Sequence, residues 1–141
     1  MAVIITLRRA HLEAMIEHAL ADAPIECCGM LSWRDGEVAS VHRARNTAAS
    51  PYRFEVHPLE TRRLVDAMEE AGNELAGFYH SHTGSEARPS PTDIRMMGPL
   101  FGPPYVHFVL GVADPDQPHA RVFQIENGTA TEHEFAILND D

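Results

Sequence analysis

The segment from His80 to Asp93 carries side chains that could bind a metal ion. His80 and His82 are separated by one residue, and Ser90 and Asp93 follow in the same short segment. Two imidazoles and one carboxylate suit zinc, and three protein ligands leave the fourth tetrahedral position open for water, as in catalytic zinc sites. A His-x-His pair alone is common, so the metal prediction depends on the ordered set of four polar residues.

The residues before this segment predict a strand that positions both histidines. Residues 75–79 are typical of a buried strand that runs directly into His80. Side chains two residues apart on a strand face the same side. We therefore expect His80 and His82 to point at one ion, and Ser81 to face away without a catalytic role.

A loop and a short helix are expected to bring in the third ligand. Gly84 and Pro89 break the strand pattern. Ser90 can cap a helix that has Pro91 as its first residue. Asp93 would then lie in the first turn, where its carboxylate could face back toward the end of the strand.

The whole pattern resembles the motif of the JAMM (MPN-plus) metallopeptidase family. That motif is an upstream Glu, then His-x-His, seven residues, Ser, two residues and Asp, and here residues 83–89 are the intervening seven. The upstream glutamate is matched by Glu26, since residues 26–31 resemble the Glu-x-Cys-Gly-x-Leu segment of bacterial members. The resemblance covers nearly the whole chain.

The resemblance implies a fold, a site and a substrate class. The fold would be α/β, with a mixed curved β-sheet flanked by helices in a cytidine-deaminase-like arrangement. One zinc ion would be held by His80, His82 and Asp93, with Glu26 as general base and Ser90 as oxyanion donor. The run from Tyr79 to Thr83 and the compact size resemble the actinobacterial peptidases that release cysteine from a ubiquitin-like sulfur carrier protein. This resemblance implies a role in cysteine biosynthesis.

The expected chemistry is hydrolysis of an amide bond by a metal-activated water. A zinc ion lowers the pKa of a bound water from about 15.7 toward 7. Glu26 would take the proton and hand it to the leaving amine, and the Ser90 hydroxyl would stabilise the negative oxygen of the tetrahedral intermediate. The plainer alternatives are an ordinary strand-edge glutamate at Glu26 and a simple helix cap at Ser90.

Bulk properties limit the other classes of function. The 141 residues, 44% of them hydrophobic, fit one domain spanning 1–141. A net charge of -10 argues against nucleic acid as a partner, and no apolar stretch is long enough to span a bilayer. The adjacent Cys27 and Cys28 do not form a disulfide framework, so we expect buried, inert thiols and a cytoplasmic location. A homodimer is compatible with these features, which do not define the oligomeric state.

Hydrophobic patterns and turn residues outline the remaining elements. Expected strands lie at 3–7, 26–33, 38–45, 75–79, 105–112, 121–126 and 129–135, and expected helices at 9–21, 58–71 and 91–97. Asn127-Gly128 is a strong hairpin signal. Because hairpins are mixed with helices, a mixed sheet is favoured over a doubly wound parallel sheet.

Two other functions stay open beside the peptidase. One is a non-catalytic MPN-type scaffold, and the other is a zinc hydrolase acting on a different small amide. A nucleoside deaminase would need a Cys-x-x-Cys pair that this chain lacks.

The short connections at 83–91 and 98–104 favour an open groove for an extended diglycine tail, which could pair with a sheet edge. His57 stands where many relatives carry Asp before Pro, which puts a helix-capping role in doubt. We expect a surface histidine there, with a substrate-facing role as the alternative, and we expect His107 to be a core histidine.

Overall fold

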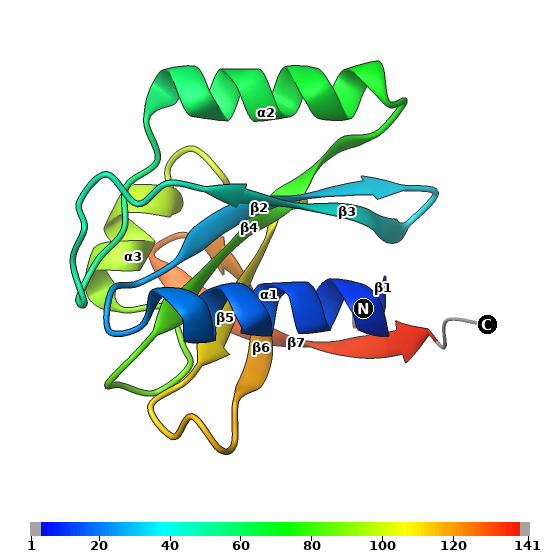
Figure 1. The fold of residues 1–141 in the computed structure, drawn as a ribbon. Coiled ribbons are helices and arrows are strands. Elements are labelled where there is room, and N and C mark those ends of the chain that lie inside the picture. Colours follow the sequence, from blue (N-terminus) through cyan, green and yellow to red (C-terminus); the bar gives the residue numbers. More distant parts are fainter. Residues whose placement is uncertain (1–3, 139–141) are drawn as a thin grey trace.

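A single sheet of seven strands, with three helices packed on it, makes up the described part of the chain. The structure is a computed structural model, which describes residues 4–138 (Figure 1). The elements in chain order are β1 (Ile4–Arg8), α1 (Arg9–Asp22), β2 (Cys28–Arg34), β3 (Glu37–Ala44), α2 (Pro58–Glu70), β4 (Glu74–His82), α3 (Pro91–Met97), β5 (Val106–Gly111), β6 (His119–Glu126) and β7 (Thr129–Leu138). None of these helices has the length and apolar character needed to cross a membrane.

The sheet is mixed and curves until it closes. Its strand order is β1-β3-β2-β4-β5-β6-β7, and β1 joins the two ends by pairing in parallel with β7. The ladder between β1 and β3 consists of one residue pair, Thr6 with Glu37. β4 runs antiparallel to β2 and parallel to β5, so it lies in the middle of the sheet. The predicted α/β class with a mixed curved sheet is confirmed.

The helices cover opposite sides of β4. Met15 and Ala19 of α1 pack with Tyr79 in one core cluster. Leu64 of α2 and Met97 of α3 pack with other strand residues in a second cluster. Figure 1 shows α1 and α2 on different sides of the β2–β4 region. From Phe78 onward, alternate residues of β4 therefore face different helices: Phe78 lies in the cluster of α2 and α3, and Tyr79 lies in the cluster of α1.

Several strand boundaries differ from the expected ones. β2 begins at Cys28 rather than at Glu26, because the Glu26 backbone bonds to the β3–α2 loop instead of to a neighbouring strand. β7 extends to Leu138, since β1 pairs with it as far as that residue. Residue 3 of the expected first strand lies outside the described residues.

Two other histidines, His57 and His107, form hydrogen bonds to the backbone. His57 is exposed, as expected, but it also caps α2, because its Nδ1 accepts the Leu59 N–H at 3.1 Å. The doubt about a capping role at this position was therefore wrong. His107 is 3% exposed, and its Nε2 donates to the Phe101 carbonyl at 2.9 Å, which confirms a satisfied core histidine.

Candidate metal centre

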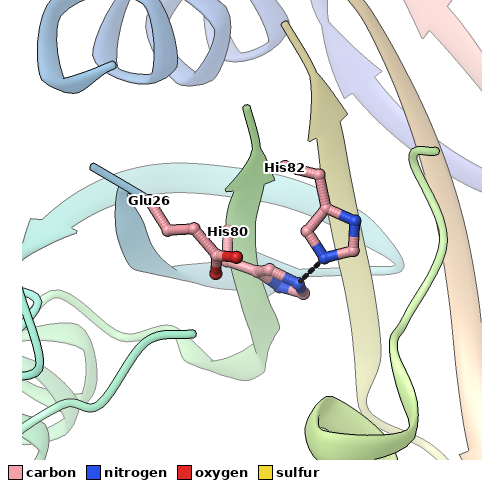
Figure 2. A group of neighbouring side chains, drawn as sticks. All are labelled: Glu26, His80 and His82. Atoms are coloured by element: carbon pink, nitrogen blue, oxygen red, sulfur yellow. Dashed lines mark hydrogen bonds between the residues drawn. The ribbon is translucent and has the colours of Figure 1, made fainter. Parts of the chain in front are cut away.

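The end of β4 places two imidazoles side by side in the core. His80 and His82 are 3% and 4% exposed, and their Nε2 atoms lie 3.1 Å apart (Figure 2). The strand keeps both on the face that points toward α3, because they are two residues apart. Ser81, between them, faces the other way, and its Oγ accepts the Cys27 N–H at 2.8 Å.

The first turn of α3 brings a carboxylate onto the same point. Oδ2 of Asp93 lies 2.9 Å from Nε2 of His80 and 3.1 Å from Nε2 of His82. Ligand atoms at about 2.0–2.1 Å around a tetrahedral zinc ion would be separated by about 3.3 Å. The three atoms therefore converge as ligands of one small cation would.

Two orphaned oxygens support a cation at this point. Among the described side chains, Oε1 of Glu26 and Oδ1 of Asp93 are buried polar atoms without a hydrogen-bond partner. Buried polar atoms rarely lack a partner, and a cation held between these two carboxyls would supply one. Ligand atoms of Glu26, His80 and His82 also lie within 4.8 Å of one another, and Figure 2 shows the Glu26 carboxylate beside the His80 ring. The residues present fit a bound metal ion.

Neighbouring groups orient both imidazoles. Nδ1 of His82 donates to the Glu86 carbonyl at 2.6 Å, so the neutral ring presents the Nε2 lone pair to the site. Phe54 stacks on His80, with ring centroids 4.5 Å apart and an angle of 25° between the planes. Phe54 itself is 2% exposed, so the ring it supports has little freedom to turn.

The pKa values of the two carboxyls of the site are shifted in opposite directions. Burial raises the pKa of Glu26 to about 8, and the nearby His82 opposes this effect while Asp93 adds to it. Burial also disfavours the charged form of Asp93, but the hydrogen bonds from His80 and His82 hold its pKa below the usual range. One carboxyl is therefore ionised at neutral pH while the other exchanges a proton near neutrality, a division typical of acid–base sites.

The pKa values of the two histidines are also shifted in opposite directions. Burial lowers the pKa of His80, which favours the neutral form that binds metals. Burial acts in the same direction on His82, but its hydrogen bonds to Asp93 and to the Glu86 carbonyl together raise its pKa. A bound cation would compete with that proton for the Nε2 atom of His82.

The structure brings together every site residue named from the sequence, namely Glu26, His80, His82, Ser90 and Asp93. Sequence reasoning missed Phe54, because nothing in its local pattern indicates contact with a histidine 26 residues later. Cys27 and Cys28 are free and buried, and burial raises the pKa of each thiol to about 12. Neither thiol is available as a thiolate ligand at neutral pH.

Comparison with known families agrees with this geometry. Residues 8–126 match the model that describes prokaryotic homologues of the JAB domain. The chain belongs to this JAB family. The match covers all five site residues, so the JAMM-type resemblance seen in the sequence is confirmed.

Similar proteins with names include peptidases. The JAB-family chain is 33% identical over 138 residues to the CysO-cysteine peptidase of Mycobacterium tuberculosis, covering 96% of this chain and 92% of that protein. It is 34% identical over 93 residues to a probable TtuB-protein conjugate cleaving protease of Thermus thermophilus, covering 65% of this chain and 62% of the other. The solution structure of protein DSY2949 from Desulfitobacterium hafniense superposes with a TM-score of 0.86 at 32% identity, covering 97% of this chain and 94% of that one. The chain is a JAB-family hydrolase.

Proposed function

We propose that this hydrolase is a zinc peptidase that cuts the amide bond at the C-terminus of a ubiquitin-like sulfur carrier protein and releases cysteine. The observation that carries the substrate is the similarity, over 96% of the chain, to a CysO-cysteine peptidase. The observation that carries the chemistry is the convergence of His80, His82 and Asp93 beside the buried carboxyl of Glu26.

Zinc suits the donor set better than a hard cation would. Two imidazole nitrogens and one carboxylate oxygen are typical ligands of catalytic zinc, whereas calcium and magnesium prefer oxygen ligands alone. We assign His80, His82 and Asp93 as the ligands of one zinc ion per chain. When bound there, zinc supplies Lewis-acid activation of water and of the scissile carbonyl.

The remaining residues handle protons and charge. Glu26 has a pKa of about 8 in the metal-free protein and a buried oxygen without a partner. A cation in the site would lower this pKa and favour the carboxylate, which can accept a proton and deliver it to the leaving amine. Ser90 Oγ accepts the Asp93 N–H, which leaves its hydroxyl hydrogen available. We assign that hydrogen to the carbonyl oxygen of the scissile bond, where negative charge develops.

A groove for the carrier tail is available next to these residues. Phe54, Phe78, Leu100 and Phe101 contribute to the lining of an apolar cavity of about 380 Å³. Phe54 belongs both to this cavity and to the ring stack on His80, so the cavity adjoins the site. Only glycine lets a peptide backbone approach a buried metal closely, so a diglycine end suits such an entrance.

A second candidate differs only in the leaving group. The similarity to a protein-conjugate cleaving protease favours an isopeptidase that releases a whole protein from a ubiquitin-like modifier. Both candidates use the same five residues and the same reaction. We place either activity in the cytoplasm, because two free buried cysteines suit a reducing compartment.

The test uses a ubiquitin-like carrier that ends in diglycine, joined either to cysteine or to the side chain of a lysine in a second protein. The zinc-loaded hydrolase is expected to remove the cysteine, which intact-mass spectrometry detects as the loss of one residue. Chelation should stop the reaction and added zinc should restore it. Faster cleavage of the lysine conjugate would favour the second candidate, and no cleavage of either conjugate would overturn both.

A further inference from the structure

The position of the Glu26 carboxylate depends on where the backbone of Glu26 lies. Its Oε1 atom is buried without a hydrogen-bond partner, and the residue lies in the segment before β2 rather than in the strand ladder. Figure 2 shows the side chain reaching from this segment toward His80. A shift of the backbone at Glu26 would therefore move the carboxylate relative to the histidines.

The loop between β3 and α2 holds this backbone on both sides. The Glu26 N–H donates to the Ser50 carbonyl at 3.0 Å. The Glu26 carbonyl accepts Nδ2 of Asn46, also at 3.0 Å. Asn46 is the only one of these three residues that uses its side chain in the contact, so the link can be removed by substitution.

The Asn46 amide makes four hydrogen bonds, which is the full capacity of its two N–H groups and one oxygen counted as two acceptor sites. Nδ2 donates to the carbonyls of Glu26 and Arg53, both at 3.0 Å. Oδ1 accepts the N–H groups of Ala48 and Glu55, both at 3.0 Å. The reversed orientation would turn the amide oxygen toward two carbonyl oxygens, so the partners decide which atom is nitrogen.

Two of these partners flank Phe54 in the chain. Asn46 bonds to the carbonyl of Arg53 and to the N–H of Glu55, and so fixes the backbone on either side of the ring that stacks on His80. One amide therefore ties the segment that carries Glu26 to the ring that supports a metal-binding histidine.

We propose that Asn46 is a positioning residue for amide hydrolysis, which sets the place of Glu26 relative to His80. This role rests on the proposed function, in which Glu26 moves a proton between water and the leaving amine. Small errors in the placement of reacting groups are costly, since a displacement of about 1 Å can reduce a rate about 100-fold. The Oδ1 bonds hold the loop itself, and the one to Ala48 forms an ordinary Asx turn. Of the four bonds, the one from Nδ2 to the Glu26 carbonyl reaches the segment of the proposed base.

Asn46→Asp separates the two roles. The carboxylate keeps the acceptor bonds to Ala48 and Glu55 but loses both donor bonds, including the one to Glu26. We expect kcat for release of cysteine from the carrier conjugate to fall at least tenfold, with KM within about twofold and zinc content unchanged. Asn73→Asp, after the end of α2, makes the same chemical change away from the site and is expected to behave as wild type.

A readout without activity completes the test. In metal-free protein, amide hydrogen exchange at Glu26 should accelerate in Asn46→Asp and stay unchanged in Asn73→Asp, because the segment loses one of its two anchors. A wild-type protein that cleaves no conjugate would refute the proposed function, while the exchange rate would still report on Asn46. Wild-type kcat or unchanged exchange in Asn46→Asp overturns the positioning role.

Asn46→Ser provides a second test in case Asn46→Asp does not fold. The shorter hydroxyl side chain carries no added charge and cannot span both carbonyls, so the same fall in kcat is expected with zinc bound. If neither variant folds or binds zinc, Asn46 is a structural residue of the loop and the positioning role is overturned.

Discussion

Ser90 and Asp93 hold each other through a reciprocal pair of hydrogen bonds. Ser90 Oγ accepts the Asp93 N–H at 3.0 Å, and Oδ2 of Asp93 accepts the Ser90 N–H at 2.9 Å. The same Oδ2 atom lies 2.9 Å from Nε2 of His80. The capping box of α3 therefore orients the carboxylate, while the hydroxyl hydrogen of Ser90 takes no part in the cap.

Substitutions at Ser90 can separate its capping role from its proposed catalytic role. Ser90→Ala should lower the free energy of unfolding by about 0.5–2 kcal/mol, whereas Ser90→Gly should cost only a few tenths, about 0.3 kcal/mol. Both variants lose the hydroxyl, so we expect kcat to fall about 10²–10³-fold in both. Urea unfolding and steady-state kinetics measure the two effects. A Ser90→Gly variant with full activity would show that Ser90 only caps the helix.

Zinc should stabilise the folded protein through Asp93. A ligand that binds only the folded state at 100 times its Kd adds about 2.7 kcal/mol, so Tm should rise when zinc is added to metal-free protein. Asp93→Ala removes one of the three proposed ligands and should abolish most of this shift. The comparison uses the zinc-induced change in Tm, because the substitution also removes a partner of Ser90 in the cap.

Asp66→Ala serves as the matched control for zinc binding. Asp66 lies on α2 and pairs with Arg62 on the surface, with 59% of its side chain exposed. Its zinc-induced shift in Tm should equal that of wild type. A shift that survives in Asp93→Ala at full size would mean that the zinc ion sits elsewhere.

Local patterns were sufficient to predict that His80, His82 and Asp93 lie together. His80 and His82 share a face because they are two residues apart on a strand, and Asp93 follows Ser90 by one helical turn. These relationships depend only on strand and helix geometry. Glu26 is different, since its approach to the histidines depends on tertiary contacts, and the sequence suggested it only through resemblance.

The closure of the sheet could not be predicted from local pattern. β1 and β7 pair although they lie far apart in the sequence, and each would otherwise be an edge strand. A substrate tail therefore cannot pair with the edges at which residues 4–8 and 134–138 bond to each other. Among the described strands, the side of β3 that faces β1 is an edge that remains for such a tail, because the ladder between them has only the pair Thr6 with Glu37. Asn46, in the loop after β3, was also missed, because its four bonds join segments that are separate in the sequence.

His107 should make stability depend on pH in the acidic range. Burial lowers its pKa from 6.5 to about 4, although its bond to the Phe101 carbonyl opposes this effect. Between these values the unfolded chain binds a proton that the folded chain does not, so the free energy of unfolding falls as pH falls from 6.5 to 4. The whole loss is about 3 kcal/mol at most. His107→Gln keeps a donor for the carbonyl and should lose this dependence.

Urea unfolding at several values of pH, for wild type and His107→Gln, measures this effect by difference. The carboxylates common to both proteins cancel in the comparison. His119→Gln replaces an exposed histidine on β6 and should follow wild type. Parallel curves for wild type and His107→Gln would contradict the assignment.

Glu26→Gln should abolish hydrolysis and leave zinc in place. A protonated carboxyl and an amide are nearly isosteric, and the pKa of about 8 means that the metal-free protein already holds Glu26 mainly protonated at pH 7. The fold should therefore tolerate the amide, and zinc content should match wild type because the three proposed ligands are intact. Because the amide cannot accept a proton, kcat should fall about 10²–10⁴-fold.

Binding of the carrier conjugate should survive in this variant, so Kd measured by titration with the intact conjugate should stay near that of wild type. Glu13→Gln, on the exposed side of α1, makes the same substitution away from the site and should keep full activity. Loss of zinc from Glu26→Gln would make Glu26 a ligand rather than a base, since a proton acceptor is not needed to hold the ion. Full activity with zinc bound would place the base elsewhere, because an amide cannot take a proton from water at neutral pH.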